Sequence, residues 1–198
     1  MLTSSKAALS LLILTCFASP SWAGAAAAND PELRKALLDA VSNAESFHDR
    51  FEAEVWLLDM SNRLQQSHFK RYMPEKDERL EFLRLVHQEA TRADLPPELV
   101  LALIQVESAF QRFAISRVGA RGYMQIMPFW KKEIGRVDDN LMHPPTNLRY
   151  GCTILRHYLN KEKGNWTRAL ARYNGSLGRT VYPEKVMNAW QQNWFVNY

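Results

Sequence analysis

The sequence is poor in cysteine. Of its 198 residues, only Cys16 and Cys152 could form a disulfide bond. Cys16 lies in an N-terminal stretch with the layout of an export signal, because Lys6 precedes an apolar run over residues 7–17 and small residues follow up to Ala23. We expect residues 1–23 to be a cleaved signal peptide, which leaves Cys152 unpaired and the mature chain without an internal disulfide. Cys152 is then expected to be a small buried core residue.

The sequence also lacks a hydrophobic run long enough to span a bilayer. The apolar part of the signal falls short of the ~20 residues that a spanning helix needs, so we expect no stable membrane span. Lipid attachment at Cys16 is disfavoured, because Ile13, Leu14 and Thr15 do not place a small residue directly before it. The chain is therefore expected to be exported, to the periplasm or the cell wall. The sequence indicates no particular protein partner.

Charge of one sign is not concentrated anywhere in the chain. The net charge is +4, but lysine and arginine are scattered along the sequence. An exported chain seldom meets nucleic acid, so nucleic acid is not expected as a partner. A basic chain outside the cytoplasm is better suited to an anionic polymer.

Motifs for metal binding and nucleophilic catalysis are absent as well. The five histidines form no HExxH pair, and Asp138-Asp139-Asn140 lacks the spacing of a calcium loop. There is no G-x-S-x-G motif and no phosphate-binding glycine loop. We expect neither a metal nor a cofactor.

No stretch alternates between apolar and polar residues with a period of two, so we predict an all-α fold. Residues 24–76 read as an Ala-rich linker followed by a long amphipathic helix, an N-terminal extension that ends near Pro74. Residues 77–198 read as a domain of helices of modest length. The helices predicted in it cover residues 77–94, 96–108, 148–159, 165–173 and 183–194.

One carboxylate stands where the pattern requires an apolar side chain. In the helix that begins at Pro96, Val100, Leu103 and Ile104 form an apolar stripe, and the next position on it is Glu107. Burying an unpaired carboxylate costs on the order of several kcal/mol. Either an ion pair must offset this cost, or the chemistry of the protein must require the carboxylate at this position. A carboxyl group in an apolar setting has a raised pKa and can serve as a general acid.

The plain alternative is structural. A glutamate on an apolar stripe is often paired with a nearby arginine, and Arg112, Arg117 and Arg121 follow closely. The residues downstream favour chemistry. Gly119 to Pro128 read as a loop that returns toward the end of the helix.

Three motifs in this order resemble the soluble lytic transglycosylase family, which is related in fold to goose-type lysozyme. They are Glu107-Ser108 at a helix end, Ser116 with Gly119 to Pro128, and Tyr173-Asn174. The resemblance covers roughly residues 77–198 and implies a lysozyme-like helical domain with a saccharide groove. The implied substrate is peptidoglycan, the implied partner is its glycan strands, and the implied activity is that of a murein lyase.

The resemblance assigns roles residue by residue. Glu107 would be the single catalytic acid and base, which cleaves the β-1,4 bond between N-acetylmuramic acid and N-acetylglucosamine and leaves a 1,6-anhydromuramoyl end. Tyr173 would orient Glu107, and Asn174 would hold the turn that presents it. The positions implied to contact substrate are Ser116, Gln125, Met127, Tyr173 and Asn174.

The chain departs from the family pattern at three places. Tyr123 stands where leucine is common before Met-Gln, Arg172 replaces the alanine before Tyr-Asn, and Arg117 replaces a proline. These changes put subsite preference in doubt but leave the acid in place.

Two other functions stay open on the sequence. A hydrolase of the lysozyme type would need a second carboxylate, for which Asp138 or Asp139 are candidates. A catalytically inactive wall-binding module would need no acid at all.

Overall fold

The computed structural model describes residues 44–196, and side chains from residue 53. The predicted signal peptide, Cys16 and the first part of the N-terminal extension lie outside the described residues. Within them are seven α-helices, a 3₁₀ turn (η1) and a π-helical turn (η2), and no β-strand. The elements are α3 (Ala44–Gln66), η1 (His68–Tyr72), α4 (Lys76–Arg92), α5 (Pro97–Ser108), α6 (Trp130–Ile134), α7 (Pro144–Lys161), α8 (Trp166–Tyr173), α9 (Val181–Ala189) and η2 (Trp190–Trp194). The all-α prediction is confirmed.

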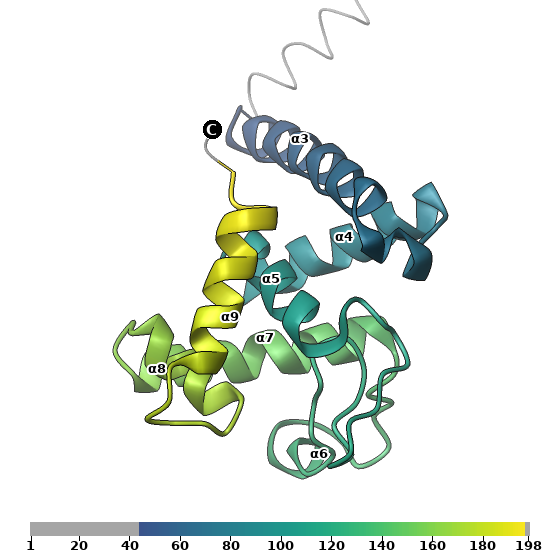
Figure 1. The fold of residues 1–198 in the computed structure, drawn as a ribbon. Coiled ribbons are helices and arrows are strands. Elements are labelled where there is room, and N and C mark those ends of the chain that lie inside the picture. The colour runs from purple at the N-terminus through teal and green to yellow at the C-terminus, as the bar shows by residue number, and fades with distance from the viewer. Residues whose placement is uncertain (1–43, 197–198) are drawn as a thin grey trace, which may run out of the picture. The chain divides into compact units, whose positions relative to one another are not determined.

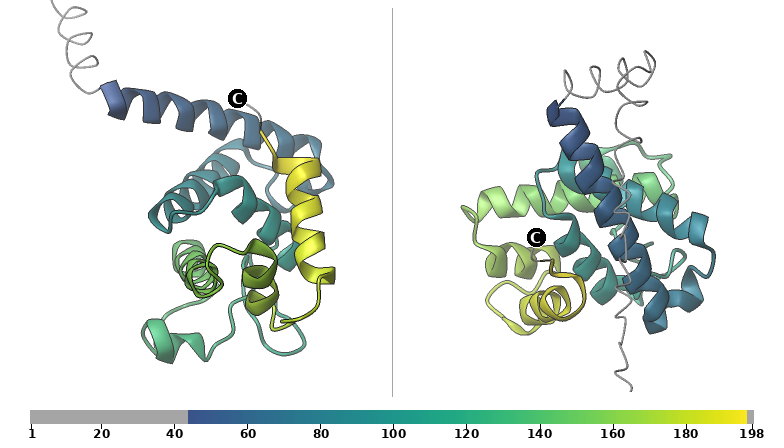
Figure 2. Two further views of the ribbon diagram at one scale, coloured as in Figure 1. Left: turned by 90° about the vertical axis from the view of Figure 1, so that its left-hand side faces the viewer. Right: turned by 90° about the horizontal axis from the view of Figure 1, so that it is seen from above.

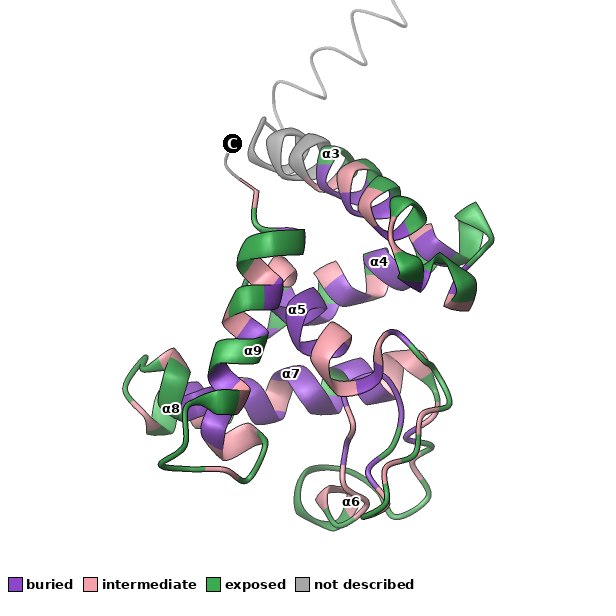
Figure 3. Cartoon of the chain, viewed as in Figure 1, coloured by how far each residue is buried: buried purple, intermediate pink, exposed green. Residues whose placement is uncertain are grey.

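Helix α5 is the centre of this arrangement (Figure 1), and it packs against α4, α9 and η2. Its residues 99–104 are all buried, which Figure 3 shows as a continuous buried stretch. The helix starts where the sequence predicted, with Pro96 at the N-cap and Pro97 in the first turn. It ends at Ser108, and the next two residues, Ala109 and Phe110, both have positive φ. Since a non-glycine residue adopts that conformation only at a cost, the buried ring of Phe110 must anchor the turn.

Helix α7 supports the loop that follows α5. It packs against α4 and α8, and α8 in turn contacts α9. Gly151 of α7 lies so close to Met124 that a Cβ atom there would be 2.2 Å from the Met124 sulfur. A glycine is therefore required where the loop crosses α7. Cys152 beside it is fully buried, as expected.

The compact unit that contains Glu107 begins at Arg50, within the residues predicted to form the N-terminal extension. Trp56 and Met60 of α3 belong to the same buried core as Phe110 and Trp194. The Trp56 indole N–H donates a 2.7 Å hydrogen bond to Glu98 of α5. Within this unit, α3 lies beside η2, the turn that follows α9 (Figure 2). There Arg63 donates a hydrogen bond to the carbonyl oxygen of Asn193. Residues 50–76 are thus part of the domain's core.

No helix among the described residues is both long and apolar enough to cross a lipid bilayer.

Candidate active site

Glu107 lies in the last turn of α5 and is only partly exposed. Burial raises the pKa of its carboxyl group to about 7, and a hydrogen bond from Tyr182 offsets part of that rise. None of the ion pairs formed among the described residues involves Glu107, so the arginine pairing considered above is absent. With a pKa near neutrality, the group can both donate and accept a proton under physiological conditions.

The tyrosine that holds Glu107 is Tyr182, in the first turn of α9, whose hydroxyl donates to Oε1 of the carboxylate. Tyr173, to which the resemblance assigned this role, forms no hydrogen bond with Glu107 among the described residues. The Tyr173 hydroxyl instead donates a 2.8 Å hydrogen bond to the carbonyl oxygen of Met124. The pKa of Tyr173 is raised, mainly by burial and secondly by the charge of Glu107. Tyr173 is therefore close enough to Glu107 to be affected by its charge. Nothing in the sequence around Tyr182 marks it as a site residue.

Tyr173 therefore ties α8 to the loop that carries Gln125. Gln125 has a positive φ, and its side-chain Nε2 donates to the carbonyl oxygens of Gly122 at 2.9 Å and Ala114 at 3.3 Å. These bonds fix the turn in a conformation that a glutamine does not favour. Local backbone strain of this kind is often found at functional sites.

Asn147 in the first turns of α7 holds the same loop from the other side. Its side-chain oxygen accepts from the Met124 N–H at 2.8 Å, and its side-chain nitrogen donates to the carbonyl oxygens of Arg121 and Leu141, each at 2.8 Å. The residue is almost completely buried. Nothing local in the sequence reveals its partners Met124 and Arg121, which lie more than twenty positions away.

The other predicted site residues do not form hydrogen bonds with Glu107. The Ser116 hydroxyl accepts from the Ala120 N–H at 3.0 Å and closes the turn between them. Met127 is partly buried, and Asn174 is exposed at the C-cap of α8. The Ser108 hydroxyl donates to the Ile104 carbonyl oxygen at 3.2 Å.

Asp139, a candidate for the second carboxylate, forms hydrogen bonds within its own part of the chain. Oδ2 of Asp139 accepts from the Tyr150 hydroxyl at 2.5 Å and from the Arg136 N–H at 2.9 Å. The Tyr150 hydrogen bond is the main reason why the pKa of Asp139 is lowered. Asp139 therefore stabilises its own loop, and Asp138 is exposed. Among the described residues, no three His, Cys, Asp or Glu side chains are grouped to hold a metal ion.

The family model for the transglycosylase SLT domain matches residues 84–193, which is more than half of the chain and includes Glu107, Gln125, Tyr173 and Tyr182. The chain belongs to this family. Among curated proteins, an SLT-family relative is the transglycosylase of Enterobacteria phage PRD1, which is 31% identical over 115 residues, 54% of this chain and 42% of the relative. Another is membrane-bound lytic murein transglycosylase C of Yersinia pestis, 28% identical over 116 residues, 50% of this chain and 32% of the relative.

The chain thus spans less than half the length of these curated relatives. Among solved structures, lytic transglycosylase Slt of Pseudomonas aeruginosa is similar at 26% identity and a TM-score of 0.45, over 56% of this chain and 22% of that protein.

The SLT-family departure at Arg172 has a structural explanation. Arg172 and Arg168, both on α8, bind the carboxylate of Glu162 at the end of α7. The arginine thus joins α7 to α8 and leaves Tyr173 in place. The departure at Arg117 has no explanation in the structure.

Proposed function

We propose that this chain is a lytic transglycosylase that cleaves peptidoglycan glycan strands without water. The observation that carries the proposal is a partly buried carboxyl group, Glu107, whose pKa is about 7 and which accepts a hydrogen bond from the hydroxyl of Tyr182. It lies in a chain of the SLT transglycosylase family.

In the proposed reaction, protonated Glu107 donates its proton to the glycosidic oxygen between N-acetylmuramic acid and N-acetylglucosamine. The bond from the anomeric carbon to that oxygen breaks. The carboxylate then takes the proton from the muramoyl 6-hydroxyl, whose oxygen bonds to the anomeric carbon. The products are a free N-acetylglucosamine hydroxyl and a 1,6-anhydromuramoyl end, and the proton on Glu107 is restored.

Tyr182 is a positioning residue in this proposal, because its hydroxyl holds Oε1 and leaves the second carboxylate oxygen for the substrate. Ser116, Gln125, Met127 and Asn174 are proposed to line the saccharide groove. Tyr173 is proposed to line it too, and it also holds Met124 in place. The chain would act outside the cytoplasm, with residues 1–23 as its export signal.

Digestion of purified sacculi tests the proposal by product mass. A lytic transglycosylase releases muropeptides that are one water lighter than those released by a lysozyme, whereas a hydrolase would leave an ordinary reducing end. Glu107→Gln should lower the rate at least ~100-fold, since a general acid contributes about that much or more. The matched control is Glu184→Gln at an exposed position of α9, which should digest sacculi like the wild type. An unaffected Glu107→Gln variant would contradict the assignment.

A further inference from the structure

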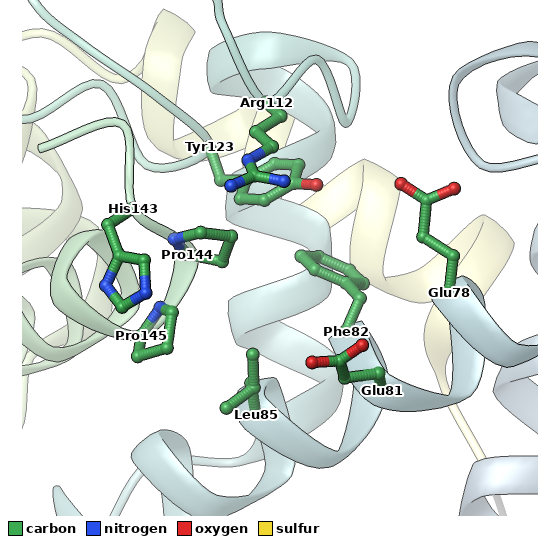
Figure 4. Close-up of a pocket in the computed structure, with 9 residues that line it drawn as sticks. All are labelled: Glu78, Glu81, Phe82, Leu85, Arg112, Tyr123, His143, Pro144 and Pro145. Carbon is green, nitrogen blue, oxygen red and sulfur yellow. The ribbon is translucent and has the colours of Figure 1, made fainter.

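A separate pocket lies between α4, the start of α7 and the loop that follows α5 (Figure 4). It encloses about 200 Å³, and neither Glu107 nor the residues proposed to line its groove contribute to it. Phe82 and Tyr123 form an aromatic wall, with ring centroids 4.7 Å apart. Both rings are almost completely buried, so little of their surface is exposed to a ligand.

Opposite charges face each other across this pocket. Glu78 and Glu81 come from α4, and Arg112 comes from the loop after α5. All three are exposed, and none forms an ion pair within the part of the chain that the structure describes. The pocket therefore offers an unpaired cation and two unpaired anions to a ligand.

Tyr123 supplies a hydroxyl between these charges. Figure 4 shows it between the guanidinium of Arg112 and the carboxylate of Glu78. Burial first, and Glu78 second, raise the pKa of Tyr123 to about 12, so the hydroxyl keeps its proton and can donate it in a hydrogen bond. This is the position where leucine is common in the family, and a leucine would provide neither the donor nor the ring edge.

We propose that this pocket binds a short peptide that carries both an ammonium group and a carboxylate, namely the peptide stem of the glycan strand. The ammonium of a diamino acid would lie between Glu78 and Glu81, and a carboxylate would bind Arg112 and the Tyr123 hydroxyl. This inference rests on the proposed function, because only a peptidoglycan substrate brings such a stem. It explains why the charged pocket and the chain's own Tyr123 occur together.

The pocket is within reach of a strand bound at Glu107. Arg112 follows Glu107 by five residues, so their Cα atoms lie at most about 18 Å apart, the span of five fully extended residues. A stem peptide gains the same ~3.3–3.6 Å per residue. A stem attached to a muramoyl residue near Glu107 can therefore extend to the pocket.

Calorimetry tests the inference by measuring how a free stem tetrapeptide binds to the full chain. The peptide has a free diamino-acid ammonium and a free C-terminal carboxylate. Acetylating the amine or amidating the carboxylate should weaken binding at least ~10-fold. The same weakening is expected from Arg112→Gln, from the double variant Glu78→Gln with Glu81→Gln, and from Tyr123→Leu. Tyr123→Leu restores the residue that is common in the family and so should fold. Arg117→Gln, in the same loop but outside the pocket, is the matched control and should bind like the wild type.

Glu107→Gln separates this inference from the proposed function. The variant should bind the stem peptide like the wild type while it fails to cleave sacculi. If the wild type cleaves sacculi but binds no stem peptide, or if Arg117→Gln weakens binding as much as Arg112→Gln, the pocket assignment is overturned. If the wild type binds the stem peptide through these residues but cleaves no strand, the pocket stands and the proposed reaction fails.

Discussion

Two opposing effects set the protonation of Glu107. Burial at the end of α5 favours the neutral acid, while the hydrogen bond from Tyr182 favours the carboxylate. Burial is the larger effect, since the pKa stands above the ordinary value, at about 7. A group that must give a proton and then take one back works best with a pKa near the ambient pH. The pair therefore suits the two proton transfers that we propose for Glu107.

Replacing Tyr182 with phenylalanine should move the pH profile of strand cleavage. The hydroxyl that stabilises the carboxylate is lost, so the pKa of Glu107 rises. Because the reaction starts from the protonated acid, the alkaline limb of kcat/KM should shift to higher pH. The loss of orientation should also lower kcat, by roughly 10-fold, the effect of one charge-assisted hydrogen bond.

Tyr173→Phe is the comparison for this variant, because its hydroxyl bonds to the Met124 carbonyl oxygen and not to Glu107. Its alkaline limb should stay where the wild type has it, whatever happens to KM. A shifted limb in Tyr173→Phe together with an unshifted one in Tyr182→Phe would reverse the two roles.

At the scale of elements, the site depends on how α7 holds the loop after α5. Asn147 binds the loop at two backbone groups, and Gly151 lets Met124 approach the helix. Met124 in turn accepts the Tyr173 hydrogen bond that joins α8. Helices α7 and α8 and the loop are thus connected through buried polar contacts. Leaving one of these buried groups without a hydrogen bond lowers the stability by more than the formed bond adds to it.

Asn147→Ala should destabilise the protein and disturb the loop. Three backbone groups lose their side-chain partner, at roughly 1–3 kcal/mol for a buried group that stays unpaired. We expect the free energy of unfolding to fall by about 2–4 kcal/mol and the Tm by about 5–10 °C, measured by denaturant and thermal unfolding. Asn160→Ala, at an exposed position of the same helix, should stay within ~0.5 kcal/mol of the wild type. Equal effects of the two substitutions would show that Asn147 has no special role.

At the scale of the whole described unit, one core joins the second half of α3 to the matched family domain. Phe69 of η1 packs against Phe110, with ring centroids 5.0 Å apart, and Phe110 packs against Trp194 at 5.5 Å. Phe110 is also the anchor of the strained turn that follows Glu107. Residues 50–76 therefore stabilise the end of the helix that carries the acid.

Two neighbouring positions of α3 test this reading. Met60 is 0% exposed and Leu58 is 54% exposed. Met60→Ala should lower the free energy of unfolding by about 2–5 kcal/mol, because it leaves a cavity in the core, whereas Leu58→Ala should cost less than ~1 kcal/mol. Chemical denaturation measures both. A small effect of Met60→Ala would mean that α3 contributes little to the core.

The sequence was enough to predict the helical class, a helix start at Pro96, one residue before the observed start of α5, and the position of Glu107 on an apolar stripe, because these follow from periodicity and capping within one helix. The sequence also indicated the family, because each of the three motifs is short and can be read without the fold. Tertiary structure alone decided that Tyr182 holds Glu107 and that Asn147 carries the loop. It also decided that residues 50–76 belong to the core. Each of these depends on contacts between residues far apart in the chain, and local propensity carries no information about such partners.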